Sequence, residues 1–485
     1  MSETQCNFLC SYPAPYWDWA PGCQFVEEQT FFPCDDKYYC RFHLPLATSD
    51  GKPTAKAQWA EAEHSAFCNE INKIIAVALD TGKAANLAGI VCSREISFND
   101  RCLPETLWIG AQFHRNVLFQ RVEFAGLSWF ERASFSLFAD FDDAKFLDMA
   151  VFKEAEFVSE GRFSRTQFKR AASFVGAKFW GCTFNRAHFA DVGVFTDAIF
   201  HANTQFESAI FESHAMFWDA QFLGDSHFRS VVFGGNAYFS WFERGEPSNL
   251  SLADTHQART PSQQGAFYEL DFRGVRVKGT ANFNNRAFQA EADFSDCVFA
   301  HPPKFHGTKL HQGTKWYRAK FGGTDNLDAE QDFRTLRLAM ENIRDRPQEG
   351  VFFALEQRAM RRQAEWWELR RWLSLAYDLT CNYGRSPGRP LAWLGGVSIF
   401  FFLVYLALSS ATWIDGPLLR ELSVFTFRQL VKPFDLWGRG GELLMPAFTS
   451  GQPLLFKVVA AVQSILSFAL LALFILALRW QFRRG

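Results

Sequence analysis

Residues 113–157 read FHRNVLFQRVEFAGLSWFERASFSLFADFDDAKFLDMAVFKEAEF, and the spacing of phenylalanine in this stretch decides the fold. Successive phenylalanines are alternately six and five residues apart, which gives an 11-residue double unit. Apart from a short run of fives at 179–189, this spacing continues to residue 239 and returns at 267–321. A sustained spacing of this kind indicates an internal repeat rather than an ordinary globular core.

Neither common secondary structure can use this spacing. A step of 5.5 residues sends successive side chains to opposite sides of an α-helix, and steps of five and six alternate between the faces of a flat strand. Four such steps make a 22-residue turn of a square coil, in which each phenylalanine lies over the one 22 positions back. Phe113, Phe135 and Phe157 form one expected ladder of this kind, and Phe119 and Phe141 belong to another.

A second position supports the same register. The residue two before each phenylalanine is small, and positions two apart point to the same side of an extended backbone. We therefore expect one large and one small inward side chain on each side of the coil. The small residues are Ala111, Ala133, Ala139, Ala144, Ala150, Ala155, Gly161, Thr166, Ala172, Ala177, Cys182, Ala187, Gly193, Ala198, Thr204, Ala209, Ala215 and Ala220.

The A-x-F-x-x pattern resembles the pentapeptide-repeat proteins, and its alternating spacing is similar to the Phe-rich subtype of that family. The resemblance implies an all-β right-handed quadrilateral β-helix over residues 87–322, of roughly nine coils, with a polar loop inserted at 244–266. We expect residues 54–85 to form a cap on the first coil, with a helix over 54–80, because the open end of a coil needs a cover.

The first 46 residues are rich in cysteine and histidine. The chain has 11 cysteines and no basic, apolar leader at its start, so we expect reduced thiols rather than disulfides. Five cysteines and a histidine within 1–46 suit a tetrahedral zinc knuckle, which would explain how so short a segment folds. Free thiols in a cysteine-rich cap, or redox chemistry, are the alternatives.

The sequence YYCRFHLP at 38–45 is similar to the Cys/His segment that precedes the repeats in some pentapeptide-repeat proteins. This resemblance implies a structural zinc site. Its expected ligands are Cys10, Cys23, Cys40 and His43, with Cys6 and Cys34 as substitutes.

After residue 321 the pattern changes to helical periodicity. Residues 327–383 predict an amphipathic helical linker, with one helix at 327–345 and a longer one, opened by Pro347, at 348–378. Tryptophan and arginine in the second helix suit a membrane interface with anionic headgroups, whereas packing on the last coil is the alternative. This linker resembles one found in membrane-bound pentapeptide-repeat proteins.

Two apolar segments, 391–414 and 454–480, are long enough to span a bilayer. Their connection, 415–453, contains an amphipathic stretch that predicts a re-entrant or interfacial helix. Gln463, the strongly polar side chain inside a span, is expected to join helices together. Arginines at both outer flanks place both ends in the cytoplasm. We therefore expect a multi-pass protein of the bacterial inner membrane with its solenoid on the cytoplasmic side.

No catalytic motif survives inspection, and histidines such as His188, His201, His214 and His227 fall at outward positions. The near-neutral repeat region does not fit the DNA mimicry known for soluble pentapeptide-repeat proteins. We expect a non-catalytic membrane scaffold whose partners are membrane lipids and either another protein or a second copy, with no nucleic acid. The alternative is an oligomeric two-helix pore regulated by the solenoid.

Overall fold

The computed structural model describes residue 6 and residues 23–25, 30–242, 265–408, 416–431 and 453–482. The chain divides into two compact units. The first comprises residues 1–323 and 342–344 and holds the solenoid, and the second comprises 324–341 and 345–485 and holds the C-terminal helices. We call them the solenoid unit and the helical unit.

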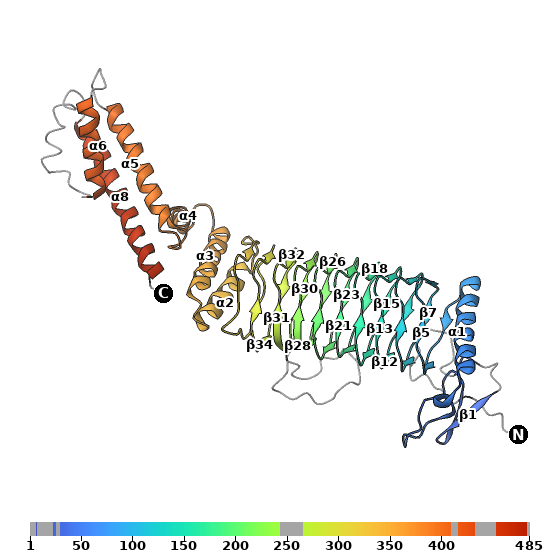
Figure 1. The fold of residues 1–485 in the computed structure, drawn as a ribbon. Helices are drawn as coiled ribbons and strands as arrows, with labels where there is room; N and C mark the ends of the chain where they lie inside the picture. Colours follow the sequence, from blue (N-terminus) through green and yellow to red (C-terminus); the bar gives the residue numbers. More distant parts are fainter. Residues whose placement is uncertain are drawn as a thin grey trace. The chain divides into compact units, whose positions relative to one another are not determined.

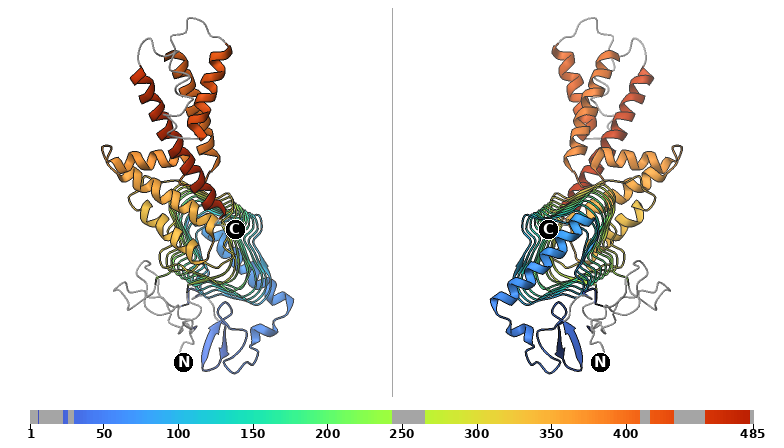
Figure 2. Two further views of the ribbon diagram at one scale, coloured as in Figure 1. Left: turned by 90° about the vertical axis from the view of Figure 1, so that its left-hand side faces the viewer. Right: turned by 90° about the vertical axis from the view of Figure 1, so that its right-hand side faces the viewer.

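The solenoid unit is a parallel β-coil whose outline is four-sided when seen end-on (Figure 2). Each side of a coil is a short strand that pairs in parallel with the strand about 22 residues away, as Phe135 pairs with Phe113 and Phe157. This arrangement confirms the expected fold class. We name the four faces after the strands β8, β9, β10 and β11, and the β8 and β9 faces join into one sheet through the long strands β28 and β31.

The bounds of the strands follow face by face (Figure 1). The β8 face contains β4 (Val91–Cys92), β8 (Gln112–Phe113), β12 (Ser134–Phe135), β16 (Glu156–Phe157), β20 (Lys178–Phe179), β24 (Ile199–Phe200), β28 (Gln221–His227), β31 (Ala266–Asp271) and β34 (Ala287–Phe288). The β9 face contains β5 (Ile96–Ser97), β9 (Val117–Leu118), β13 (Ala139–Asp140), β17 (Gly161–Arg162), β21 (Cys182–Thr183), β25 (Thr204–Gln205), parts of β28 and β31, and β35 (Ala292–Asp293).

The other two faces complete the coil. The β10 face contains β6 (Cys102–Leu103), β10 (Glu123–Phe124), β14 (Lys145–Phe146), β18 (Gln167–Phe168), β22 (His188–Phe189), β26 (Ile210–Phe211), β29 (Val232–Phe233), β32 (Arg276–Val277), β36 (Val298–Phe299) and β37 (Lys320–Phe321). The β11 face contains β3 (Ala85–Asn86), β7 (Thr106–Leu107), β11 (Ser128–Trp129), β15 (Ala150–Val151), β19 (Ala172–Ser173), β23 (Gly193–Val194), β27 (Ala215–Met216), β30 (Ala237–Tyr238) and β33 (Ala281–Asn282). The β10 face has ten strands and each of the other faces has nine among the described residues, close to the roughly nine coils expected.

The interior of the coil is filled by stacked phenylalanine rings. Phe113 and Phe135 stack with ring centroids 5.1 Å apart, Phe135 and Phe157 at 4.7 Å, and Phe119 and Phe141 at 4.8 Å. All the small residues that the pattern placed inward are buried. The predicted large-plus-small filling of each side is therefore confirmed.

The alternation of five and six residues follows from two kinds of corner. Two residues after Phe119 and Phe130, Arg121 and Arg132 adopt left-handed backbone conformations with φ of 56° and 54°, which make a tight turn within the five-residue step. These corners stack from coil to coil, so charges of opposite sign meet there. The Arg121 guanidinium, for example, donates two hydrogen bonds to the Asp100 carboxylate, at 2.5 and 2.7 Å.

One coil departs from the pattern near the insertion predicted at 244–266. Residues 243–264 lie outside the described part of the chain, and Ala266, the predicted end of the insertion, already begins β31. Arg286 occupies an inward position and is fully buried. Its guanidinium donates to the carbonyl oxygens of Phe239, of Ala220 at 2.8 Å and of Phe217 at 3.2 Å. The side chain therefore fills the space at the base of the insertion.

The N-terminal part of the solenoid unit contains an antiparallel hairpin, β1 (Phe31–Cys34) and β2 (Lys37–Cys40), the short 3₁₀ helix η1 (Ala55–Gln58) and α1 (Glu61–Thr81). The expected helix over 54–80 is thus divided, because Trp59 and Ala60 adopt extended conformations and Glu63 caps the start of α1. Phe67, Ile71 and Ile75 form the buried side of α1, which lies across the open end of the first coil (Figure 2).

The helical unit contains α2 (Ala329–Asn342), α3 (Arg346–Gln363), α4 (Leu369–Cys381), α5 (Gly388–Leu408), α6 (Gly416–Val431) and α8 (Pro453–Phe482). Asp345 caps α3 by accepting a hydrogen bond from the Gln348 amide at 3.2 Å, and Pro347 lies in the first turn. The prediction of a single helix over 348–378 is wrong, because two helices, α3 and α4, cover this segment. The chain becomes extended at Ala364 and turns back, and Asp378 of α4 then forms ion pairs with Arg358 and Arg361 of α3.

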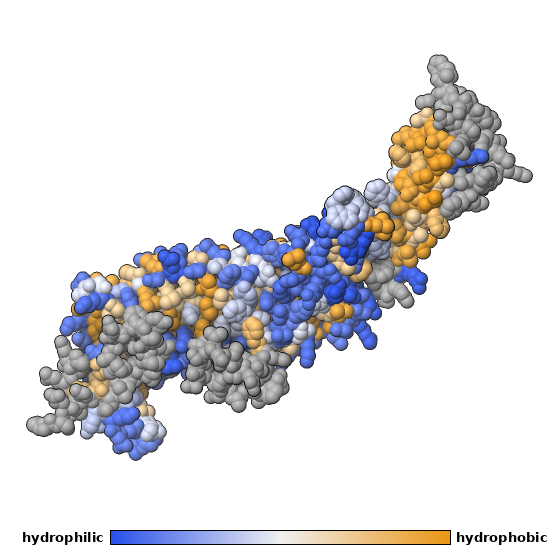
Figure 3. All heavy atoms as spheres, turned by 180° about the vertical axis from the view of Figure 1, so that it is seen from behind, coloured by the Kyte–Doolittle hydropathy of each residue, from blue (hydrophilic) through white to orange (hydrophobic). Residues whose placement is uncertain are grey.

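Two helices are long and apolar enough to cross a membrane, α5 over Gly388–Leu408 and α8 over Leu455–Arg479. Only 17% of the first and 28% of the second are buried, which is unlike the core helices of a soluble protein. Their exposed surface is apolar (Figure 3). Residues 409–415, which include the predicted end of the first span, lie outside the described residues.

Candidate metal centre and polar clusters

The candidate metal centre begins with the C-R-F-H segment that follows β2. Cys40 ends the strand, and the chain then turns, with the amides of His43 and Leu44 donating to the Cys40 carbonyl at 3.2 and 3.0 Å. This turn brings the imidazole of His43 back beside the Cys40 thiol, with Sγ and Nδ1 3.3 Å apart. Two potential ligands are thus placed by a local turn alone.

Two cysteines from earlier in the chain complete the group. Cys23 Sγ lies 3.7 Å from Cys40 Sγ, and Cys6 Sγ lies 3.5 Å from His43 Nδ1. The four ligand atoms all lie within 4.8 Å of one another. The sulfur separation excludes a disulfide, in which the bonded sulfurs are about 2.05 Å apart.

The separations suit a tetrahedral ion. With Zn–S bonds of about 2.3 Å and Zn–N bonds of about 2.0 Å, tetrahedral geometry requires roughly 3.8 Å between sulfurs and 3.5 Å between sulfur and nitrogen. The Cys23–Cys40, Cys6–His43 and Cys40–His43 separations fall close to these values. A group of three cysteines and one histidine could therefore hold a metal ion without rearrangement.

The surroundings orient the ligands. His43 Nε2 lies 3.0 Å from the Ala88 carbonyl oxygen, so this nitrogen carries the proton and leaves Nδ1 free to face the thiols. The Cys40 amide donates to Cys6 Sγ at 3.3 Å. Hydrogen bonds with Cys23 and Cys40 lower the pKa of Cys6, while those with Cys23 and Cys6, together with burial, raise the pKa of Cys40.

The expected ligand set is only partly described. Cys23, Cys40 and His43 come together, and Cys6, one of the two substitutes, takes the fourth place. Cys10 lies outside the described residues. Cys34, the other substitute, is buried elsewhere, with its Sγ 3.9 Å from the Ala47 carbonyl oxygen.

Lys56 is a neighbour of this centre that the sequence did not reveal. Its ammonium is fully buried and donates to the carbonyl oxygens of Arg41 and Phe42, the two residues between Cys40 and His43. It also lies over the Phe67 ring of α1, 4.4 Å from the centroid. Burial lowers the pKa of Lys56 to about 7. The lysine thus ties the metal-binding turn to α1.

The repeat itself agrees with a known family. A family model of pentapeptide repeats in nine copies matches residues 130–178. Pentapeptide repeats of this family are thus present in the solenoid, over residues 130–178. The comparison with curated proteins and the comparison with solved structures each give no match.

The outward histidines of the pentapeptide-repeat solenoid make ordinary surface contacts. His188 Nε2 lies 2.7 Å from the Glu212 carboxylate, and His201 stacks on Trp180 with centroids 4.3 Å apart. His214 accepts a hydrogen bond from the Asn236 amide. None of these contacts joins a histidine to a nucleophile within the described residues.

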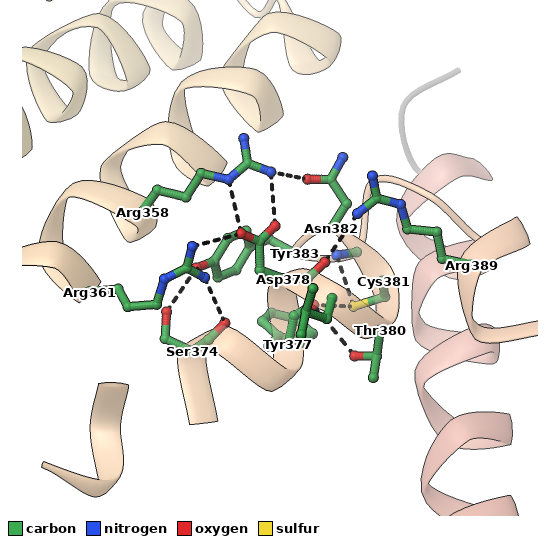
Figure 4. Close-up of polar contacts among 12 residues, drawn as sticks. Arg358, Arg361, Ser374, Tyr377, Asp378, Thr380, Cys381, Asn382, Tyr383 and Arg389 are labelled. Carbon is green, nitrogen blue, oxygen red and sulfur yellow. Dashed lines mark hydrogen bonds and ion pairs between the residues drawn. The ribbon is translucent and has the colours of Figure 1, made fainter. Parts of the chain in front are cut away.

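Beyond the pentapeptide repeats, a second polar cluster lies in the helical unit (Figure 4). The Asp378 carboxylate of α4 accepts hydrogen bonds from Arg358, at 2.8 and 3.1 Å, and from Arg361, at 3.0 Å. Burial raises the pKa of Asp378, but the two guanidiniums outweigh it and hold the pKa below its usual value. The ion pairs fix the rotation of α4 about its own axis.

A third cluster joins α5, α6 and α8. Gln463 of α8 is fully buried and accepts a hydrogen bond from the Tyr405 hydroxyl of α5 at 2.7 Å. Its amide donates to the Thr426 carbonyl of α6 at 3.3 Å. The predicted role of Gln463 in joining helices is thus visible, although its partners, Tyr405 and α6, could not be predicted from the sequence.

Proposed function

We propose that the protein is a membrane-anchored, non-catalytic scaffold that presents its solenoid on the cytoplasmic side of a bacterial inner membrane. The observation that carries this proposal is the filled interior of the coil, where ring stacking leaves the side chains facing outward as the ones able to bind a partner. A long rod with chemically distinct outer faces suits partner binding better than chemistry on a small substrate.

The outer faces differ in character. On the β11 face, the strand register aligns outward side chains into one column, most of them apolar. The column contains Leu107, Trp129, Val151, Ser173, Val194, Met216 and Tyr238; Leu107 and Val151 are buried, and the other five are half-buried. Apolar columns on a solenoid face are suited to binding a protein, so we assign the partner surface to this face.

The β9 face contrasts with it. Its outward side chains are mostly charged or polar and pair with each other from coil to coil. Arg162 donates to Asp142 at 2.7 Å, and Asp271 accepts from Arg229 and Arg273, each also at 2.7 Å. Because these groups already satisfy each other, the face has less to offer a partner and serves as a control surface.

The metal centre supports the same function. We infer that it holds a structural zinc ion, because its four ligands leave no position open for a substrate. The zinc would fold the N-terminal segment against the first coil through His43 and Ala88. This inference makes the centre part of the cap rather than a catalytic site.

The scaffold proposal is tested by partner cross-linking in native membranes. The paired substitution Val194→Glu and Met216→Glu places two carboxylates in the apolar column, and we expect cross-linked partners to be lost. The matched control, Gln205→Glu on the β9 face, should leave them in place. If both variants retain the same cross-linked partners, the β11 face is not the partner surface. If the unchanged protein cross-links to no partner under any growth condition, the scaffold proposal fails.

The alternative function is an oligomeric pore, and the buried polar side chains of α6 and α8 favour it. Besides Gln463, the Gln429 amide oxygen accepts a hydrogen bond from Ser464 at 2.5 Å, and Ser467 is also buried. Polar groups inside a membrane domain often mark a conduit. Here, however, Gln463, Ser464 and Gln429 bond to groups of the same chain, which supports helix packing over a water-filled path.

A further inference from the structure

Helix α4 is amphipathic in the opposite sense to a helix of a soluble protein. Its polar side, with Ser374 and Asp378, faces α3, where Arg358 and Arg361 bind the carboxylate and the Ser374 hydroxyl lies 2.8 Å from the Tyr383 hydroxyl. Asp378 is buried, whereas most apolar residues of the helix are not. The ion pairs therefore hold the apolar side outward.

The outward side is large and contiguous. Leu369, Trp372, Leu373 and Leu379 lie on one face of α4, and between 53% and 71% of each is exposed. The residues just before the helix, Trp366 and Trp367, are exposed as well. Exposed apolar patches of this kind mark an interaction surface, and tryptophan is enriched where protein meets the membrane interface.

The position of α4 within the helical unit identifies its partner. The helix runs across the direction of α5 and α8 (Figure 2), as a helix in the plane of a bilayer would if those two helices cross it. It is joined to the start of α5 by two hydrogen bonds. The Trp393 indole donates to the Leu379 carbonyl at 3.1 Å, and Arg389 donates to the Asp378 carbonyl at 3.2 Å.

The charge around α4 also selects the partner. Residues 358–389 contain seven arginines and three acidic residues. This excess of four positive charges complements a surface of anionic headgroups, each basic residue near such a surface contributing about 1 kcal/mol. A second protein chain could cover the apolar residues, but it would not explain both the basic excess and the crosswise position.

We propose that α4 lies flat in the headgroup region of the membrane that α5 and α8 cross, with its exposed apolar side in the lipid and its arginines on anionic headgroups. This proposal rests on the membrane anchoring proposed above and adds to it a lipid-binding surface. The Arg358–Asp378 and Arg361–Asp378 pairs are then positioning contacts that set which side of α4 meets the lipid.

Photo-cross-linking of the full-length protein tests this surface. A benzophenone amino acid replaces Leu373 in one variant and Leu338, an exposed leucine of α2, in the control. Both are reconstituted in bilayers of phosphatidylcholine with and without phosphatidylglycerol, and adducts are identified by mass spectrometry. We expect lipid adducts at position 373 in excess of position 338. The anionic lipid should be enriched among them about fivefold over its share of the bilayer, the factor for one basic residue.

The outcomes separate the two proposals. Release of the protein by an alkaline carbonate wash overturns the anchoring itself. If the protein resists the wash but position 373 cross-links to a second copy, or to no lipid, the interfacial position of α4 is overturned. Adducts without enrichment of phosphatidylglycerol overturn the anionic preference.

Quenching by brominated lipid provides a second measurement that does not depend on the unnatural residue. Trp372→Phe should reduce the quenchable fraction of tryptophan fluorescence. Trp180→Phe, which removes an exposed tryptophan of the solenoid, should not reduce it. Equal quenching of the unchanged protein and Trp372→Phe contradicts the proposal.

Discussion

Arg286 occupies a position that the preceding coils of the β8 face give to small residues, among them Ala198, Ala220 and Gly265. Burial lowers the pKa of its guanidinium to about 9, which still leaves it charged at neutral pH. It lies over the rings of Trp241 and Phe267, at 5.4 and 5.2 Å, on either side of the insertion. The side chain therefore compensates, within the core, for the interruption of the coil by the insertion.

Replacing this arginine tests that role. Arg286→Met keeps most of the volume but removes the guanidinium donor from the carbonyl oxygens of Ala220, Phe239 and Phe217, of which that of Phe217 still accepts from the Ala220 amide. We therefore expect a loss of about 3 kcal/mol. Thermal unfolding of the β-sheet circular dichroism signal in detergent measures it. Arg276→Met, an exposed arginine of the preceding coil, should change stability by less than about 0.5 kcal/mol. Equal effects of the two substitutions would show that Arg286 is not a structural residue.

At the scale of single elements, the hairpin that carries the metal-binding turn depends on contacts with other parts of the chain. The hairpin β1–β2 is only four residues long on each side, and two-stranded hairpins are marginally stable alone. Lys56, His43 and a metal ion would together attach it to α1 and the first coil. We therefore expect folding of this segment to depend on zinc.

Metal removal and ligand substitution test this dependence. The purified protein should contain a full equivalent of zinc, which Cys40→Ser and His43→Ala should abolish. Cys102→Ser, an exposed cysteine outside the cluster, should retain it. Chelation should also speed amide hydrogen exchange in residues 31–40, with no change in the central coils. Unchanged zinc content in both ligand variants would exclude the centre.

The solenoid could be predicted in detail, whereas the other elements could be predicted only in part. Phenylalanine spacing determines the inward side of the coil, since each side chain's position follows from its neighbours one turn away. The same reasoning cannot place Cys6 beside His43, because 37 residues separate them and no repeat relates their positions. The break at Ala364 was missed for a similar reason: local helix propensity favoured continuation, and the long-range pairs of Asp378 with Arg358 and Arg361 outweighed it.

At the scale of the whole molecule, the contacts among α5, α6 and α8 favour the proposed scaffold over the proposed pore. Helix α6, with 16 residues, is about 24 Å long, too short to cross a hydrocarbon core of about 30 Å. It packs instead against both α5 and α8, which also contact each other, through a cluster that includes Phe401, Tyr405, Leu422, Phe425 and Phe456. The three helices of one chain thus pack on one another around a shared apolar cluster. A conduit would have to form between several chains, at other surfaces of these helices.

The packing of α5, α6 and α8 within one chain predicts that the protein conducts no ions. Purified protein reconstituted in liposomes should give no more leak than empty liposomes, because the polar side chains of Gln463 and Tyr405 are bonded within one chain. Gln463→Leu breaks these bonds. It should lower the stability of the helical unit by about 1 kcal/mol, in line with hydrogen bonds between membrane helices, and leave flux at the background level. A conductance in the unchanged protein that Gln463→Leu abolishes, together with four or more copies per particle in nanodiscs, would instead establish the pore. Two copies or fewer could not enclose one with two spans each.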